Sequence, residues 1–366
     1  MTKTRAIGLS SRLLSEPTPE PIKLSVVVVT HESADEVSRS LPAIAAELRP
    51  GDQLIVCDNA STDGTRERVG ELAIGAELFE LGSNLGFGAA CNAGARAAEH
   101  DLLLFLNPDA VVEPGFRDAI ELPLVEHRGW DAWQPLLTSA GGSLVNSWGG
   151  VVHFTGIAWA GGAGRASAEA PVGPTEVSFA SGACLAVRRE AWEGLAGFSE
   201  EYFLYHEDTD LGLRLWLGGR RVGLEPRARC EHGYEFEKGP HKWYYLERNR
   251  YATIIRTYPS RLWLALLPGL LATELALLVV AALGGWLGPK LRADRDVVRA
   301  LPRLVEERAQ IADLARAAGP GAADGGRFAD LLTPDLDSNY LGSASQSSLL
   351  RALLRGYWRL ARLLSG

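Results

Sequence analysis

Short apolar runs alternate with amphipathic segments through the first part of the chain. The first and the last of these runs are apolar throughout, which is typical of strands buried on both faces of a sheet. The segments between the runs repeat apolar residues at helical spacing. This alternation predicts an α/β domain with a mostly parallel sheet flanked by helices. The predicted strands are Leu24–Val29, Leu54–Cys57, Glu77–Leu81 and Leu102–Leu106, and the predicted helices are Ser33–Leu48 and Thr65–Ile74.

The middle of the chain, Trp130 to Ala180, is rich in Gly, Ser and Trp and has little periodicity apart from a predicted strand at Val177–Phe179. Long loops in a compact domain are commonly functional, so we assign this stretch, with Trp148, to one side of a binding site. Further along, Ala183–Val187 predicts another strand. Asp210–Trp216 predicts a helix that ends at a pair of glycines.

The last third changes character. Leu262 to Leu287 is strongly apolar and longer than the about 20 residues that cross a bilayer, although it contains Glu274. We expect residues 260–290 to associate with a membrane, as a span or as an interfacial hairpin; a buried helical pair is the alternative. Residues 291–366 predict a helical tail with a flexible linker. Its last helix, Leu349–Leu364, is amphipathic and basic, which suits an anionic membrane surface or packing within an oligomer.

Composition narrows the class of protein. The 366 residues are 46% hydrophobic and 22% charged, as in a globular protein, and the net charge of -8 argues against a general nucleic-acid binder. Four separated cysteines without a CxxC pair indicate reduced thiols. Residues 1–23 lack a continuous apolar stretch and predict a mobile leader. The expected catalytic domain is therefore 24–259.

Candidate binding residues follow the predicted strands, because ligands of parallel sheets lie outside the carboxyl ends of the strands. Thr30, Asp58, Asn84 and Asn107 occupy these positions. A carboxylate such as Asp58 at the mouth of a buried sheet is costly unless it binds something. In the turn after the third strand, Gly86 allows a close bend around a ligand. Cys91 fills the third small position of a dinucleotide-binding fingerprint, and no acidic residue ends the following strand, so a dehydrogenase is strongly disfavoured.

Two acidic segments suggest chemistry. Asn107-Pro108-Asp109 places an amide and a carboxylate two residues apart after a strand, where they can share a cation or simply begin a turn. Glu207-Asp208-Thr209-Asp210 opens a helix and carries more charge than a helix terminus needs. A general base in this block would have its pKa raised by burial. His232 is by default structural, and Arg248 and Arg250 either clamp phosphates or face solvent.

Taken in order, these motifs resemble those of the inverting glycosyltransferases called family 2, in particular its rhamnosyltransferase-like and galactofuranosyltransferase-like members. The likeness covers Leu24 to about Pro259. Each motif alone is weak, but six in register are specific. They are Val26-Val27-Val28-Val29-Thr30, Asp58-Asn59-Ala60-Ser61-Thr62-Asp63-Gly64, Asn84-Leu85-Gly86-Phe87-Gly88, Asn107-Pro108-Asp109, Ser181-Gly182-Ala183-Cys184 and the block from Tyr205 to Asp210.

The resemblance implies a GT-A fold and a role for each matching residue. Asp208 matches the catalytic base that takes the acceptor proton. Asn107 stands where many relatives have an aspartate, which puts the strictness of the metal requirement in doubt. The implied donor contacts are Thr30, Asp58, Asn84, Gly86, Asn107, Arg248 and Arg250; the implied metal ligands are Asp109 and His232; the acceptor side is Gly182, Glu207 and Trp148.

The implied reaction moves a sugar from a UDP- or dTDP-sugar to an acceptor hydroxyl, using Mn or Mg, at the cytoplasmic face of a membrane. The acceptor would be a glycan or glycolipid, such as a lipid-linked precursor of a polysaccharide or cell wall, and no nucleic acid is involved. One alternative is a degenerate membrane protein that binds nucleotide sugars without turnover. A nucleotidyltransferase is disfavoured, because Thr30–Ser38 contains no Gly- and Lys-rich phosphate loop.

Overall fold

The computed structural model describes residues 21–233, 241–319, 325–338 and 347–365. Four of its strands lie where the apolar runs predict them. The first strand shows why. All seven of its residues are buried, because both faces of the sheet are covered by protein. The strands are β1 Leu24–Thr30, β2 Gln53–Asp58, β3 Glu77–Glu80, β4 Leu102–Leu106, β5 Ala110–Val112, β6 Ala132–Ser139, β7 Leu144–Ser147, β8 Gly150–His153, β9 Ala158–Ala160, β10 Thr175–Glu176, β11 Cys184–Arg188, β12 Val222–His232 and β13 Leu332–Thr333.

Most strands join one mixed sheet in the order β10-β12-β6-β11-β4-β1-β2-β3, with β5 on β12 and β7 on β6. β1 pairs in parallel with both β2 and β4, and β2 pairs in parallel with β3. In contrast, β11 runs antiparallel to β4. The predicted α/β class with a mostly parallel sheet is therefore confirmed. The helices are α1 Ala34–Glu47, α2 Thr65–Glu71, α3 Phe87–Ala97, α4 Phe116–Ile120, α5 Leu122–Val125, α6 Arg189–Gly194, α7 Glu207–Leu217, α8 His241–Thr257, α9 Ser260–Leu283, α10 Leu287–Ala317, α11 Gly325–Asp330 and α12 Ser348–Ser365, with 3-10 turns η1 Ser167–Glu169 and η2 Glu200–Tyr202.

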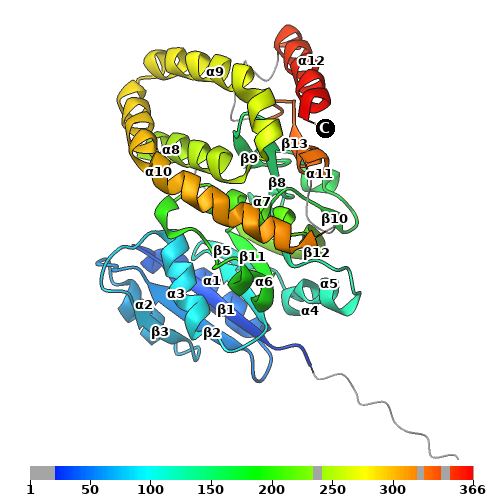
Figure 1. Cartoon of the computed structure of the whole chain (residues 1–366). Helices are drawn as coiled ribbons and strands as arrows, with labels where there is room; N and C mark the ends of the chain where they lie inside the picture. The colour runs from blue at the N-terminus through cyan, green and yellow to red at the C-terminus, as the bar shows by residue number, and fades with distance from the viewer. Residues whose placement is uncertain (1–20, 234–240, 320–324, 339–346, 366) are drawn as a thin grey trace, which may run out of the picture.

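Helices cover both faces of the sheet. Alternate residues of β1 point to opposite sides, so Val26 and Val28 join one core with α1 and α4, while Val27 and Val29 join another with α3 and α7. Gly94 of α3 lets this helix approach the strand closely. Figure 1 shows α1, α2 and α3 around β1 to β3 at one end of the molecule and α9 and α12 at the other.

The middle of the chain differs from the prediction. Residues 132–139, expected to be loop, form β6 between β11 and β12, and seven of its eight positions are buried. Gln134 and Pro135 interrupt its apolar pattern, but the Gln134 amide is buried and its Oε1 accepts a hydrogen bond from Ser181 N at 2.8 Å. The strand expected at Val177–Phe179 is wrong: β10 ends at Glu176, and Phe179 makes only an isolated bridge.

The C-terminal third folds back onto the catalytic domain. A third core contains Phe154, next to β8, together with Leu266 of α9, Phe328 of α11 and Trp358 of α12. β13 pairs with β8, so residues 325–338 of the expected flexible linker are packed structure. Residues 1–20 of the expected leader, and the remainder of the linker, lie outside the described residues.

Replacing Gly94 with Val should destabilise the fold. A Cβ at Gly94 would lie 2.3 Å from Val27 Cγ1 and 3.0 Å from Cys57 Sγ, so α3 must move away from the sheet. Overpacking of this kind costs about 1–3 kcal/mol of unfolding free energy. In the control Gly70→Val, on α2, a new Cβ meets nothing within 4 Å, and the change should stay within about 0.5 kcal/mol. Urea unfolding of both variants measures the difference; equal midpoints would contradict the packing argument.

Candidate active site

The carboxyl ends of β1, β2 and β4 meet at one edge of the sheet. In the parallel pair β1–β2, Thr30 lies opposite Asp58, and in the pair β1–β4, Val28 lies opposite Leu106. β11 is antiparallel to β4 and begins at the same edge, since Cys184 pairs with Leu106. The segments that the sequence selects as binding loops therefore gather in one region, as the topology of a parallel sheet requires.

Asn59 joins the loop after β2 to the loop after β3. Its Nδ2 donates to Asn84 Oδ1 at 2.9 Å, and its Oδ1 accepts from Leu85 N at 2.7 Å. Gly86 has a φ of +85°, and a Cβ there would lie 2.6 Å from Phe203 O, so the loop needs glycine at this point. Asn84 and Gly86 thus lie beside the end of β2. Sequence reasoning passed over Asn59, although its place directly after the strand was a signal.

Asp58 is held by its own loop. Its Oδ1 accepts from Thr30 Oγ1 at 3.0 Å and from Ser61 Oγ at 2.5 Å, and its Oδ2 accepts from Ser61 N at 3.0 Å. Arg66 Nε lies 3.9 Å from Asp58 Oδ2, and the Asp58 side chain is 1% exposed. Contact with a base, the role implied by resemblance, would require one of these hydrogen bonds to be exchanged. In this structure Asp58 fixes the shape of the loop.

The residues expected to bind metal come together. β12 brings His232 opposite Ala110, and His232 Nε2 lies 3.3 Å from Asp109 Oδ1 and 3.3 Å from Asn107 Nδ2. The other ring nitrogen, Nδ1, lies 3.4 Å from Asn146 Oδ1. Asn146, on β7, was not identified from the sequence, because its strand lies in the stretch expected to be loop. The long strand β12 explains how a histidine more than 120 positions later reaches this corner.

This corner fits a divalent cation in part. Within the described residues, no group of three or more His, Cys, Asp or Glu side chains is placed to hold a metal ion. Asp109 and His232 nevertheless offer a carboxylate and an imidazole, which are ordinary ligands of Mn²⁺. The Asp109 side chain is 26% exposed, so part of its carboxylate is accessible to a ligand from solvent.

Glu207 and Asp208 form an acidic pair at the start of α7, in which Glu207 is buried and Asp208 is partly buried. Asp208 Oδ2 accepts from Gly182 N at 3.1 Å and Oδ1 accepts from Thr209 N at 2.7 Å, while burial raises the pKa of Asp208. Burial, and then the charge of Asp208, raise the pKa of Glu207 to about 8. Glu207 Oε2 is buried without a hydrogen-bond partner in the described part of the chain. Glu207 is therefore mostly protonated at neutral pH, and the base candidate is Asp208.

The third acidic residue of this block, Asp210, is structural. Its carboxylate accepts from Arg214 Nε at 2.7 Å and from Arg256 Nη1 at 2.8 Å, and it is fully buried. Burial alone would raise the pKa of Asp210, but the two guanidinium charges outweigh it and lower the pKa. The Asp210–Arg214 pair lies within α7, whereas the Asp210–Arg256 pair joins α7 to α8 and so helps to fix the helix on which the acidic pair sits.

A strained bend precedes the acidic pair. Phe203, Tyr205 and His206 have φ values of 62°, 67° and 68°, in the left-handed region that non-glycine residues rarely adopt. Asn249 of α8 holds the bend, because its Nδ2 donates to Leu204 O at 2.8 Å and Tyr205 O at 2.7 Å. Strain of this kind persists only where surrounding contacts impose it and is common at functional sites. The sequence contains no signal for the role of Asn249, which lies within an ordinary amphipathic helix.

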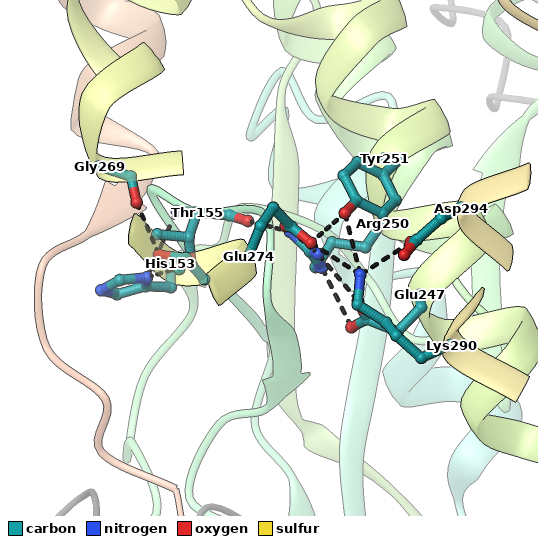
Figure 2. Close-up of polar contacts among 10 residues, drawn as sticks. His153, Thr155, Glu247, Arg250, Tyr251, Gly269, Glu274, Lys290 and Asp294 are labelled. Carbon is teal, nitrogen blue, oxygen red and sulfur yellow. Dashed lines mark hydrogen bonds and ion pairs between the residues drawn. The ribbon is translucent and has the colours of Figure 1, made fainter. Parts of the chain in front are cut away.

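Three of the predicted residues make contacts that the sequence did not indicate. Arg250 is 2% exposed, and its guanidinium binds Glu247 and Glu274 at 2.9 and 2.5 Å, so it is not free to clamp a phosphate (Figure 2). Arg248 donates to Tyr202 O at 2.8 Å and lies over the neighbouring tyrosine rings. Trp148 packs on Gly161 and Gly162. The phosphate role expected of Arg250 is therefore corrected to a structural one.

Known proteins share both sequence and fold with this chain. The family model described as glycosyl transferase family 2 matches residues 25–195. The N-acetylglucosaminyl-diphospho-decaprenol L-rhamnosyltransferase of Mycobacterium tuberculosis is 31% identical over 231 residues, which are 57% of this chain and 75% of the relative. The O-antigen biosynthesis protein RfbC of Myxococcus xanthus is 28% identical over 226 residues, covering 57% of this chain and 17% of that protein.

Solved structures agree on the fold. GalNAc-T7 with UDP, GalNAc and Mn²⁺ superposes with a TM-score of 0.55 at 15% identity, over 69% of this chain and 51% of that one. Residues 1–349 of S. aureus TarS in complex with UDP-GlcNAc give a TM-score of 0.50 at 16% identity, over 94% of this chain and 89% of that one. These likenesses confirm a GT-A-like α/β fold. The sequence matches show that the chain belongs to glycosyltransferase family 2.

Proposed function

We propose that this glycosyltransferase moves a sugar, with inversion, from a UDP- or dTDP-sugar to a hydroxyl of a lipid-linked glycan precursor at the cytoplasmic face of a membrane. The observation that carries the proposal is the placement of Asp208. Its carboxylate, with a raised pKa, is bound to Gly182 N directly before β11, whose first residue pairs with the end of β4. A base and a diphosphate site therefore share one edge of the sheet.

The nucleotide is assigned to the loops after β1, β2 and β3. Thr30, Asn59 and Asn84 line this region with hydroxyl and amide groups, and Asp58 keeps the loop in shape through Ser61. Amide and hydroxyl groups can pair with the donors and acceptors of a base and a ribose. The assignment to uridine or thymidine rests on the family resemblance.

The donor diphosphate is assigned to the corner at the end of β4. Asp109 and His232, with Asn107 beside them, would hold a divalent cation there. When bound, such a cation offsets the negative charge that grows on the leaving diphosphate. The 3.3 Å contact between Asp109 and His232 already points two ligand atoms at the same place. In GalNAc-T7, whose fold is similar, the structure contains UDP and Mn²⁺.

The acceptor is assigned to the side of the site formed by Gly182, Glu207 and Trp148. Asp208 takes the proton from the attacking hydroxyl, and its raised pKa favours this transfer near neutral pH. Protonated Glu207, with its unpaired Oε2, can form a hydrogen bond with the acceptor. A polyprenyl-diphosphate acceptor is suggested by the decaprenol-linked substrate in the name of the mycobacterial relative, and RfbC suggests a polysaccharide pathway.

Replacing Asp208 with Asn should abolish transfer but keep donor binding. The isosteric amide cannot accept the proton, and loss of a general base lowers the rate about 10²- to 10⁴-fold. The assay measures release of UDP or dTDP from a panel of sugar nucleotides, with Mn²⁺ and a polyprenyl-diphospho-N-acetylglucosamine acceptor. The control is Asp101→Asn, at the opposite end of β4. A wild type that binds donors without turnover would instead indicate a degenerate binding protein.

Replacing Asp109 with Asn should raise the Mn²⁺ concentration that gives half-maximal activity by at least about tenfold. The change removes the charged ligand that we assign to the cation, while the amide keeps the shape of the side chain. Titration of Mn²⁺ at saturating donor measures the effect, and the control is Glu113→Gln, at a half-exposed carboxylate after β5 that pairs with Arg229. Identical Mn²⁺ curves for wild type and Asp109→Asn would rule out this corner as the metal site.

Glu207 should make the unfolding free energy depend on pH. Its pKa is about 8 in the folded protein and near the ordinary 4.5 in the unfolded chain, so unfolding releases a proton between these values. Stability from the protonated form is present at acid pH and is lost as pH rises from about 5 to about 8. Urea midpoints across this range should therefore fall less for Glu207→Gln than for wild type. The control Glu71→Gln, on exposed α2, should follow wild type; parallel curves for Glu207→Gln would refute the shift.

A further inference from the structure

The helices α9 and α12 lie at the same end of the molecule (Figure 1), and each exposes a stripe of apolar residues. On α9, the exposed residues recur every four or seven positions, and Leu264, Leu275 and Leu283 are 62%, 68% and 85% exposed. α12 exposes a second stripe, in which Leu353 and Leu363 are 62% and 81% exposed. An exposed apolar area of this extent on two adjacent helices marks an interaction site. The stripes are Leu264, Leu271, Leu275, Val279 and Leu283 on α9, and Leu349, Leu353, Leu360, Leu363 and Leu364 on α12.

The arginines of α12 indicate what covers this surface. At 100° per residue, the exposed leucines fall in one sector of about 100° and the arginines in a neighbouring sector, while Trp358 and Ala361 face the protein. The helix contains no acidic residue, although the chain as a whole has a net charge of -8. A leucine face flanked by a cationic face matches the boundary between the acyl chains and the anionic headgroups of a membrane. The arginines are Arg351, Arg355, Arg359 and Arg362, all exposed, of which Arg355 pairs with Asp335 at 2.7 Å and Arg362 with Asp330 at 2.6 Å at the surface.

α9 is long and apolar enough to cross a bilayer, and only 17% of its most apolar window is buried. One stripe of the helix is nevertheless packed against protein along its whole length. Leu262 and Ala281, near its two ends, are fully buried, and Leu266 lies between them. Tyr357 of α12 binds the middle of the same helix: its hydroxyl donates to Ala265 O at 2.8 Å and accepts from Gly269 N at 2.9 Å.

Glu274 secures this packed stripe with charge. Its carboxylate binds Arg250 Nη2 at 2.5 Å and Lys290 Nζ at 2.7 Å, and Tyr251 OH donates to it as well (Figure 2). Lys290 is fully buried and also binds Glu247 at 2.9 Å and Asp294 at 2.8 Å. The cluster joins α9 to α8 and α10. Moving Glu274 into a bilayer would leave Arg250 and Lys290 buried with fewer counter-charges, which is strongly unfavourable.

Both ends of α9 contact the same pair of helices. At its start, Ser260 Oγ accepts from Arg308 Nη2 of α10 at 3.0 Å. Just beyond its end, the Trp286 ring stacks on Trp243 of α8 at 4.7 Å. α8 and α10 themselves pack together, through Tyr244 OH and Asp296 at 3.0 Å. A helix whose two ends are attached to one polar body cannot place them on opposite sides of a bilayer about 30 Å thick.

We propose that the exposed faces of α9 and α12 form one monotopic surface that lies in the headgroup region of an anionic bilayer, and that α9 does not span it. The membrane surface itself does not depend on the proposed function. Only its assignment to the cytoplasmic leaflet rests on that function. The surface is joined to the active site through α8, because Arg250 holds the membrane-side cluster and the preceding residue, Asn249, holds the bend before the acidic pair. The active site would thus be held at a fixed distance from the membrane in which a lipid-linked acceptor lies.

Vesicle flotation tests the surface. The full chain should bind vesicles of phosphatidylcholine and phosphatidylglycerol more strongly than vesicles of phosphatidylcholine alone, and salt should weaken the binding. The double variant Leu353→Ser and Leu360→Ser should bind at least about tenfold more weakly, because two exposed leucines leave the lipid. The matched control, Val125→Ser and Val172→Ser, changes exposed apolar residues of the catalytic domain and should bind like wild type. Unchanged binding of the leucine variant would overturn the proposal.

Cysteine labelling tests the topology, since the four native cysteines are buried. Arg261→Cys and Gly288→Cys place exposed thiols at the two ends of α9. Neither should react with a membrane-impermeant maleimide in intact bacterial cells, and both should react after the cells are opened. Labelling of only one site in intact cells would show a span and overturn the proposal. Labelling of both would keep the monotopic surface and contradict the cytoplasmic location instead.

These tests separate the surface from the enzyme activity, since flotation uses neither donor nor acceptor. A chain that binds vesicles but lacks transferase activity would retain the membrane surface and lose the proposed function. A chain that turns over sugar nucleotides but ignores anionic vesicles would lose the surface alone.

Discussion

The register of β1 with its two parallel neighbours is the constraint on which the site depends. Because Thr30 lies opposite Asp58 and Val28 opposite Leu106, the loops after three strands leave the sheet at one edge. β11 extends this edge in the opposite direction, and Asn107 N donates to Ala183 O at 2.9 Å where the two strands meet. The backbone of the next residue back, Gly182, reaches Asp208. A shift of one residue in β1 would turn its buried faces over and separate these groups.

α8 carries a second constraint. Asn249 fixes the strained bend before the acidic pair, Arg256 binds Asp210 inside α7, and Arg250 binds Glu274 of α9. One helix therefore links the catalytic carboxylates to the C-terminal helices. Buried ion pairs contribute little net stability compared with apolar packing, but removing one partner is costly. We interpret this network as a device that fixes the relative positions of α7, α8 and α9.

Periodicity predicted the elements that obey it. Four strands, two helices and the long C-terminal helices follow from apolar spacing, and the order of the strand ends predicted that Thr30, Asp58, Asn107 and Asp109 would lie at one edge. β6 was not predicted, because Gln134 and Pro135 interrupt its apolar run. The buried Gln134 amide accepts a hydrogen bond from Ser181, which lies far along the chain. The pattern of residues within one strand gives no information about such distant hydrogen-bond partners.

The same limit applies to side chains whose role depends on partners far along the chain. Arg250 sits in a sequence that suits a phosphate clamp, yet Glu274, 24 residues later, neutralises it. Asn249 and Asn146 contact the site only because α8 and β7 are brought there by tertiary packing. Asp58 was correctly placed by its strand, whereas its hydrogen bonds to Ser61 depend on the conformation of the loop, which composition does not determine.

The most direct test of the account is anomalous diffraction from a crystal of this protein soaked with UDP and Mn²⁺. The account predicts one manganese peak within about 2.2 Å of an Asp109 carboxylate oxygen, next to His232, with the nucleotide over the loops after β1 and β2 and Asp208 facing the diphosphate. A manganese peak and nucleotide bound elsewhere, with Asp109 still paired to His232, would contradict the assignment of this edge as the donor site.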